Sequence, residues 1–181
     1  HIATGWREDV GGDVKVEDKT YAYVKPQFVA DLPAGKYRIQ AEKGMEYIPT
    51  SVEFEVVSSE GKPVELVFQR WSNMESQGWY SGDTHTHFLN DYSALLESQA
   101  EDLNVINVLA TKWGELITNA NEVTGIPSLI SQPENIVFFN EETRHNFLGH
   151  TILHPIKELI YPLTWGGPSE GVLEGYDYPA M

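Results

Sequence analysis

The stretch Gly82-Asp83-Thr84-His85-Thr86-His87 decides how the rest of the chain is interpreted. On a β-strand alternate side chains point to the same face, so His85 and His87 are expected to project together. Two neighbouring imidazoles held by a rigid backbone form a bidentate chelate for a transition metal. For an isolated His-x-His motif, a pair of exposed or hydrogen-bonded histidines without a metal is an equally open reading. The surrounding sequence therefore has to decide.

A helix and a buried strand are expected after this histidine pair. Apolar residues at helical spacing predict a helix over residues 92–103, with Asn90 and Asp91 available as caps. The nearly continuous apolar run at residues 104–110 is typical of a strand buried on both faces. Strand, helix and buried strand form a βαβ unit, so this half of the chain is predicted to be α/β with parallel strands.

Candidate ligands follow the next two predicted strands, at residues 136–139 and 148–153. Glu141 and Glu142 come directly after the first of these, and His150 lies at the start of the second. In parallel α/β proteins functional groups gather at the carboxyl ends of strands. A carboxylate and three imidazoles at adjacent strand ends would bind a divalent transition metal, namely zinc, manganese or iron.

The N-terminal part of the chain has a different pattern. It contains short alternating polar and apolar runs separated by turn residues, at 20–24, 28–32, 36–41, 52–57 and 64–68. This predicts an antiparallel β-sandwich over residues 1–72, and the change of pattern places a second domain at residues 73–181. Leu32-Pro33-Ala34-Gly35-Lys36-Tyr37 and Gly44-Met45-Glu46-Tyr47 resemble a carboxypeptidase-regulatory-like, prealbumin-type module, which implies the same fold.

Composition limits the classes of partner. The chain has 181 residues, 41% of them hydrophobic, and a formal net charge of −15, so a soluble globular protein is expected. Nucleic acid and anionic membranes are excluded as expected partners because both would be repelled, and a small-molecule substrate is expected instead. The chain has no cysteine, which rules out disulfides, thiolate metal sites and a thiol nucleophile. A secreted or periplasmic location is favoured.

Two motifs carry a resemblance to a known family. The segment Gly78-Trp79-Tyr80-Ser81-Gly82-Asp83-Thr84-His85-Thr86-His87 resembles the opening motif of the CehA/McbA-type metallohydrolases. These belong to the PHP (polymerase and histidinol phosphatase) superfamily of distorted β/α barrels. Asn140-Glu141-Glu142-Thr143-Arg144, followed by Leu148-Gly149-His150, resembles a later block of the same family.

The resemblance implies a set of metal ligands and a reaction. The implied ligands are His85, His87, Glu142 and His150, with Glu142 preferred over Glu141 because it takes the third place of its block. The implied reaction is hydrolysis of a phosphoester, ester or carbamate bond by metal-activated water.

Three other residues have open roles. Arg144 either orients an anionic group of the substrate or is a solvated or salt-bridged arginine. Asp83 is expected to be a partner of a ligand imidazole or a cap of the strand end. His154 shares a strand face with His150, which makes it a further candidate ligand.

The chain departs from the family pattern in three places. Phe88-Leu89-Asn90-Asp91 stands where a Ser-Asp pair is usual, and Ala110-Thr111-Lys112-Trp113-Gly114 stands where a Thr-Asp-His ligand motif is usual. The sequence also ends at Met181, before the remaining strands of such a barrel. We therefore expect the N-terminal portion of an incomplete PHP-type barrel, in a fragment or truncated form of a hydrolase. The alternative is a non-catalytic binding or adhesion module with a degenerate metal site. Copies of the chain are expected to associate and complete the open barrel.

Overall fold

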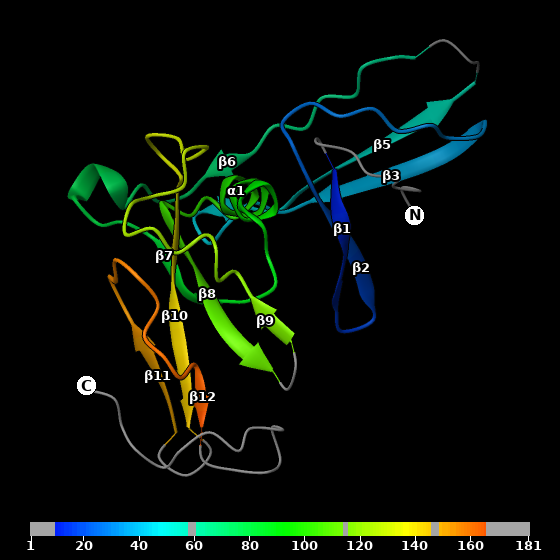
Figure 1. Ribbon diagram of the computed structural model, residues 1–181. Helices are drawn as coiled ribbons and strands as arrows, with labels where there is room; N and C mark the ends of the chain where they lie inside the picture. Colours follow the sequence, from blue (N-terminus) through cyan, green and yellow to red (C-terminus); the bar gives the residue numbers. More distant parts are fainter. Residues whose placement is uncertain (1–9, 58–60, 114–115, 146–148, 166–181) are drawn as a thin grey trace. The chain divides into compact units, whose positions relative to one another are not determined.

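The computed structural model describes residues 10–57, 61–113, 116–145 and 149–165 (Figure 1). Contacts along the backbone divide the chain into two compact units. The first contains His1–Tyr80 together with Gln99–Asp102, and the second contains Ser81–Ser98 and Leu103–Met181. The main division therefore follows Tyr80, a few residues after the boundary predicted from the sequence.

Most of the regular structure is β. In chain order the elements are β1 (Val10–Val16), β2 (Lys19–Val24), β3 (Gly35–Ala41), β4 (Tyr47–Ile48), β5 (Thr50–Val56), β6 (Gln69–Arg70), the 3₁₀ helix η1 (Glu75–Gln77), β7 (Gly82–Thr86), α1 (Asp91–Ala100), β8 (Val105–Trp113), β9 (Leu116–Thr118), β10 (Ile136–His145), β11 (Gly149–Leu153) and β12 (Thr164–Trp165).

The first unit consists of antiparallel pairs of strands. β1 pairs with β2, β3 with β5, and β4 with β6, each as a separate two-stranded sheet. Three of the predicted strands are thus present as β2, β3 and β5, but residues 28–32 and 64–68 form no strand. Alternation of polar and apolar residues indicates which side chains could share a face of a strand. A strand also needs a neighbouring strand to pair with its backbone, and the alternation does not provide one. Among the described residues the three pairs are separate sheets, so a sandwich-like arrangement of this unit stays a prediction.

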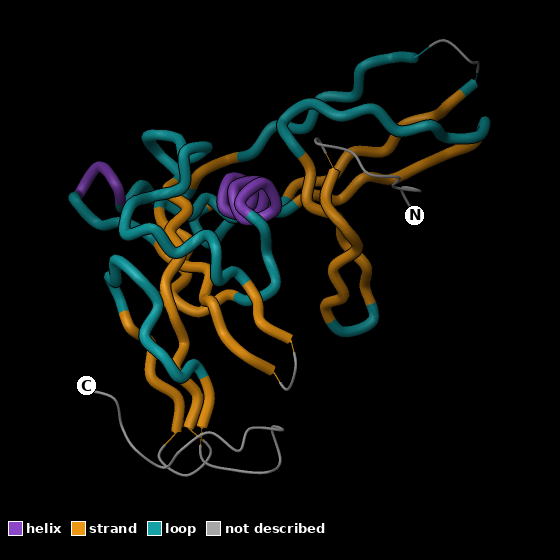
Figure 2. The backbone as a smooth tube through the Cα atoms, viewed as in Figure 1, coloured by secondary structure: helices purple, strands orange, loops and turns teal. Residues whose placement is uncertain are grey.

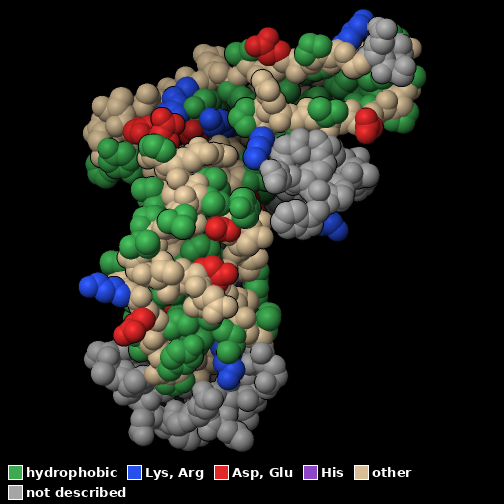
Figure 3. Space-filling view, turned by 45° about the horizontal axis from the view of Figure 1, so that its top comes forward, with side chains coloured by type: hydrophobic (Ala, Val, Ile, Leu, Met, Phe, Trp, Pro, Cys, Tyr) green, Lys and Arg blue, Asp and Glu red, His purple; other side chains and the backbone are tan. Residues whose placement is uncertain are grey.

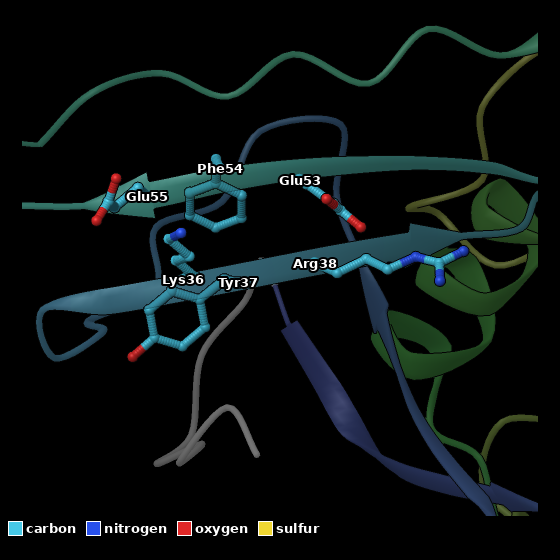
Figure 4. Close-up of a pocket in the computed structure, with 6 residues that line it drawn as sticks. All are labelled: Lys36, Tyr37, Arg38, Glu53, Phe54 and Glu55. Atoms are coloured by element: carbon cyan, nitrogen blue, oxygen red, sulfur yellow. The ribbon is translucent and has the colours of Figure 1, made fainter.

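Half-buried and exposed side chains alternate along both strands of the β3–β5 ladder. Tyr37 and Phe54 are cross-strand partners whose rings stack with centroids 5.8 Å apart. A shallow hollow lies on this ladder, lined by Lys36, Tyr37, Arg38, Glu53, Phe54 and Glu55 (Figure 4). Its basic residues on β3 stand opposite its acidic residues on β5, so the hollow carries no excess of either charge.

The second unit is built on one curled sheet. The strand order is β11-β10-β8-β7, with β12 also paired to β10 and β9 also paired to β8. β7, β8, β10 and β12 run parallel to one another, whereas β9 pairs antiparallel with β8 and β11 pairs antiparallel with β10. The predicted unit of strand, helix and parallel strand is confirmed as β7, α1 and β8.

The predicted α/β barrel is wrong. The described residues contain one α-helix, and the fold is mostly β with a curled half-barrel sheet, so neither a PHP-type nor a TIM-type barrel is supported. The connection from β9 to β10 is a loop throughout its length (Figure 2). This segment contains Gly125 and two prolines, Pro127 and Pro133, which oppose a helix. One correct βαβ unit therefore does not extend into a repeating α/β pattern.

The core of the second unit lies on one face of the sheet. Alternate side chains of β8 and β10 gather with Ala94 of α1 into a buried apolar cluster, which comprises Ala94, Ile106, Val108, Val137 and Phe139. The intervening residues of the same two strands point to the other face, and several are polar yet buried, among them Asn107, Asn140 and Glu142. Apolar packing thus fixes the strands on one face and leaves polar side chains together on the other.

The face of the molecule in Figure 3 is mixed in charge, although the composition is acidic. On the face shown in Figure 3, basic and acidic side chains both occur in small groups among apolar and uncharged ones. In the part of the chain that the structure describes, no helix has the length and apolar character needed to cross a membrane.

Candidate metal centre

The ring nitrogens of the two histidines in the opening motif lie close together. β7 ends at Thr86, and the Nε2 atoms of His85 and His87 lie 3.1 Å apart. Just before them, the carboxylate of Asp83 accepts a hydrogen bond of 2.9 Å from the backbone N–H of His85. The structure therefore shows Asp83 bonded to the backbone of β7 itself, where the pairing of β7 with β8 is irregular between Asp83 and Thr86.

Strand β8 holds this histidine pair in place. Asn107 donates from Nδ2 to the Thr84 carbonyl at 3.0 Å, and the Thr86 hydroxyl donates to the Asn107 carbonyl at 2.9 Å. Nδ1 of His87 lies 3.3 Å from the Leu109 carbonyl, which can only accept, so Nδ1 carries a proton. In the neutral ring the lone pair is then on Nε2, the nitrogen that faces Glu142 and could bind a metal there.

Glu142 completes the cluster from strand β10. Its side chain is 2% exposed, and its two oxygens lie 3.4 Å from Nε2 of His85 and 3.0 Å from Nε2 of His87. His85, His87 and Glu142 are the group of metal-ligating side chains that converges among the described residues. Because a neutral His87 turns its lone pair toward a carboxylate oxygen, a positive charge between the two, either a proton or a metal ion, would stabilise the arrangement.

The spacing of these donor atoms fits a transition metal. Ligand atoms bound to one tetrahedral ion at about 2.0–2.1 Å are themselves about 3.3 Å apart. The two histidine Nε2 atoms lie 3.1 Å apart, Oε1 of Glu142 lies 3.4 Å from that of His85, and Oε2 lies 3.0 Å from that of His87. With one ligand atom taken from each residue, all three lie within 4.8 Å of one another. The side chains therefore already lie near the positions that they would take around a common ion.

Two further predicted residues surround the same carboxylate. His150, on β11, places Nδ1 2.8 Å from Oε1 of Glu142, and its side chain is 42% exposed. Arg144, which is its register partner on β10, lies with Nε 3.8 Å from Oε2 of Glu142 and is 7% exposed. His150 does not belong to the three-residue convergent group, although it contacts Glu142. Leu148 of the predicted motif lies outside the described residues.

Glu141 is separated from this cluster by the alternation of the strand. It is fully buried, accepts a hydrogen bond from the Thr143 hydroxyl at 2.7 Å and another from the backbone N–H of Ile160 at 2.7 Å. Burial raises the pKa of the Glu141 carboxyl, and the two hydrogen bonds oppose the increase without cancelling it. The two adjacent glutamates thus occupy different environments, and Glu142 is the one beside the histidines.

Sequence reasoning missed several polar residues that support the centre. Asn107 and Asn140 are buried on the same face as Glu142 and bond to each other, while the Thr111 hydroxyl donates to the Glu142 carbonyl at 3.3 Å. The signal available for Asn107 was an amide inside an otherwise apolar run. His154 lies against Asn140, with Nδ1 3.0 Å from Nδ2, and is not in the convergent metal-ligating group.

Comparison with protein-family models, with curated proteins and with solved structures gave no match for this chain. The resemblance of its motifs to a metallohydrolase family therefore stays a prediction, and so does the predicted association of copies.

Proposed function

We propose that the chain binds a divalent transition metal at His85, His87 and Glu142 and hydrolyses a small-molecule substrate there. The observation that supports this most strongly is that one ligand atom from each of these three residues lies within 4.8 Å of the other two, while the two histidine nitrogens are 3.1 Å apart. The proposal rests on this donor set and not on an analogy of fold.

The donor set favours a particular class of metal. Two imidazole nitrogens and one carboxylate oxygen suit zinc, manganese or iron(II). Calcium and magnesium prefer ligand sets made only of oxygen atoms, so they are disfavoured here. A copper thiolate or iron–sulfur site is excluded because the chain has no cysteine.

The environment of the donors supports turnover more than a purely structural role. Three protein ligands leave a coordination position for water or substrate, whereas structural zinc sites are closed by four. The side chain of His85 is 47% exposed, so this side of the centre is open to a ligand. A divalent transition metal at such a position activates water and polarises the bond to be hydrolysed.

The remaining residues of the centre orient the ligands and set its charge. The Leu109 carbonyl holds the His87 ring in the metal-binding tautomer, and strand β10 fixes Glu142 in a nearly solvent-free position. Arg144 supplies a buried positive charge beside Glu142, which favours a substrate that carries or develops negative charge.

The proposal is tested with a panel of phosphoesters, aryl esters and aryl carbamates in the presence of zinc, manganese or iron(II). We expect turnover that a chelator removes, that metal restores, and that His87→Ala abolishes. His145→Ala is the matched control, because it removes a histidine outside the convergent group. Metal bound at one ion per chain without turnover on any substrate would overturn the hydrolase and favour the binding-module alternative.

A further inference from the structure

Asn140 is fully buried, and its side-chain amide has partners at both N–H groups and at its oxygen. Its Nδ2 group donates to Oδ1 of Asn107 at 2.6 Å and lies 3.0 Å from Nδ1 of His154. Its Oδ1 atom accepts from the backbone N–H of Ile156 at 3.1 Å. An amide nitrogen has two N–H groups, so both are accounted for by these two contacts.

The orientation of this amide is fixed independently at two points. Asn107 donates from Nδ2 to the Thr84 carbonyl at 3.0 Å, so its Oδ1 atom faces Asn140 and requires a donor there. The Ile156 N–H can only donate, so it requires the oxygen of Asn140. Both constraints place Nδ2 of Asn140 against His154, which removes the usual ambiguity of amide assignment.

His154 is therefore held in one tautomer. Because Asn140 donates, Nδ1 of His154 must accept, and a neutral imidazole that accepts at Nδ1 carries its proton on Nε2. The ring also packs edge-to-face on Phe138, with centroids 6.2 Å apart. The only lone pair of the neutral ring is occupied, so this histidine presents a donor and has no nitrogen left for a metal.

The donor lies on the same face of the sheet as the metal centre. β11 pairs Ile152 with Glu142 and Leu153 with Glu141, so His154 follows directly along this line and contacts Asn140. Asn140 and Glu142 are two residues apart on β10, which is about 7 Å along one face of a strand. Nε2 of His154 points away from the buried Asn140, and the residue is exposed.

We propose that His154 is a neutral hydrogen-bond donor to an oxygen atom of the ligand at the His85–His87–Glu142 centre, and that it is not a metal ligand. The statement that His154 is not a metal ligand depends only on the hydrogen bonds of Asn140. The statement that it donates to a bound ligand rests on the proposed function. Neutral imidazoles can stabilise an oxygen that gains negative charge, and this needs no transfer of the proton.

The tautomer is tested by ¹⁵N NMR of the imidazole nitrogens in the metal-free protein, with the His154 signals assigned by their loss in His154→Gln. We expect a protonated Nε2 and an unprotonated Nδ1. On titration with zinc, the signals of His85 and His87 should shift and those of His154 should keep their tautomer pattern. A protonated Nδ1, or zinc coordination at His154, would overturn the proposal.

The donor role is tested on cobalt(II)-loaded protein by titrating inorganic phosphate and following the visible spectrum of the metal. We expect His154→Phe to weaken phosphate binding at least about 10-fold, because one charge-assisted hydrogen bond is lost. His154→Gln, which keeps an N–H donor, should recover part of the affinity, and both variants should bind cobalt as the wild type does.

The outcomes of these experiments separate the two proposals. Equal phosphate affinity in His154→Phe and wild type would overturn the donor role of His154 while leaving the hydrolase proposal intact. Failure of every substrate in the hydrolysis panel would overturn the hydrolase while the phosphate titration still decides the role of His154.

Discussion

The two adjacent glutamates of β10 should respond in opposite ways to the same substitution. Glu142 lies 3.8 Å from the guanidinium Nε of Arg144, and both side chains are almost completely buried. Removing one member of a buried ion pair leaves the other charge without compensation, which costs about 3–5 kcal/mol. The separation is long for an ion pair, so we expect Glu142→Gln to cost about 3 kcal/mol, at the lower end of that range.

Glu141 has no cation among its two hydrogen-bond partners, which are the Thr143 hydroxyl and the Ile160 N–H. Its pKa is raised above the ordinary value of 4.5 by burial. The protonated form is therefore favoured in the folded state, and this contribution to stability is present at acid pH and lost as the pH rises through the folded-state pKa. Glu141→Gln removes the cost of burying a charge, so it should stabilise the protein near neutral pH. The difference from wild type should disappear at acid pH.

The assay is urea denaturation of the metal-free proteins at pH 7, with chelator present so that metal binding makes no contribution. A loss of about 3 kcal/mol in Glu142→Gln corresponds to a decrease of about 6–12 °C in the melting temperature. The double variant Glu142→Gln with Arg144→Met should recover much of the loss, because no buried charge remains. Equal stability changes in the two Gln variants, or strict additivity of the double variant, would refute the reasoning.

Three further substitutions test the fold that holds the centre. Asn90→Ala should cost about 1 kcal/mol, because Oδ1 of Asn90 caps α1 by accepting from the Ser93 N–H at 2.9 Å. Val108→Ala should cost about 2 kcal/mol by opening a cavity at a fully buried core position. Both losses are measured as changes in the free energy of unfolding in urea. Gly125→Ala should destabilise more than an exposed control, because its φ is +78° and an added Cβ would meet the Lys157 Cα at 2.8 Å; an unchanged midpoint would contradict this.

The local elements of the second unit were largely predictable, because each has a periodic signal of its own. The helix expected at residues 92–103 is present as α1, Asp91–Ala100, and it stops earlier than its apolar spacing suggests. Asp102 has a positive φ of 56°, a conformation that ends a helix and that apolar periodicity does not report. The overall architecture was not predictable in the same way, because one βαβ unit leaves the later connections undetermined.

The sequence pattern did not predict correctly where the carboxylates of Glu141 and Glu142 lie. An apolar run predicted a strand at residues 136–139, with Glu141 and Glu142 following it. Strand β10 in fact continues through His145, because its polar residues are satisfied by neighbouring strands and by segment 156–160. The two glutamates therefore lie on opposite faces of one strand, and only a partner such as His87 distinguishes them. A strand whose buried side chains are polar and hydrogen-bonded has no apolar pattern by which the sequence could reveal it.

The contacts of His154 were likewise not predictable from the sequence pattern. Its sequence position beside a proline gives no indication of what it contacts, and its shared strand face with His150 suggested a ligand. The structure shows instead that a buried amide, Asn140, occupies Nδ1. The residue that determines the chemistry of a histidine is often a neighbour distant in sequence, and here that neighbour comes from another strand.

The central claim is most directly tested by measuring metal binding to the purified chain. Titration with zinc or cobalt(II), together with elemental analysis after dialysis, should show one ion per chain. His85→Ala, His87→Ala and Glu142→Gln should each weaken binding by more than about 100-fold, beyond the usual effect of altering a residue that only supports a ligand. His145→Ala should bind as the wild type does. The absence of stoichiometric metal in the wild type, or equal affinity in wild type and His87→Ala, would contradict the metal centre described above.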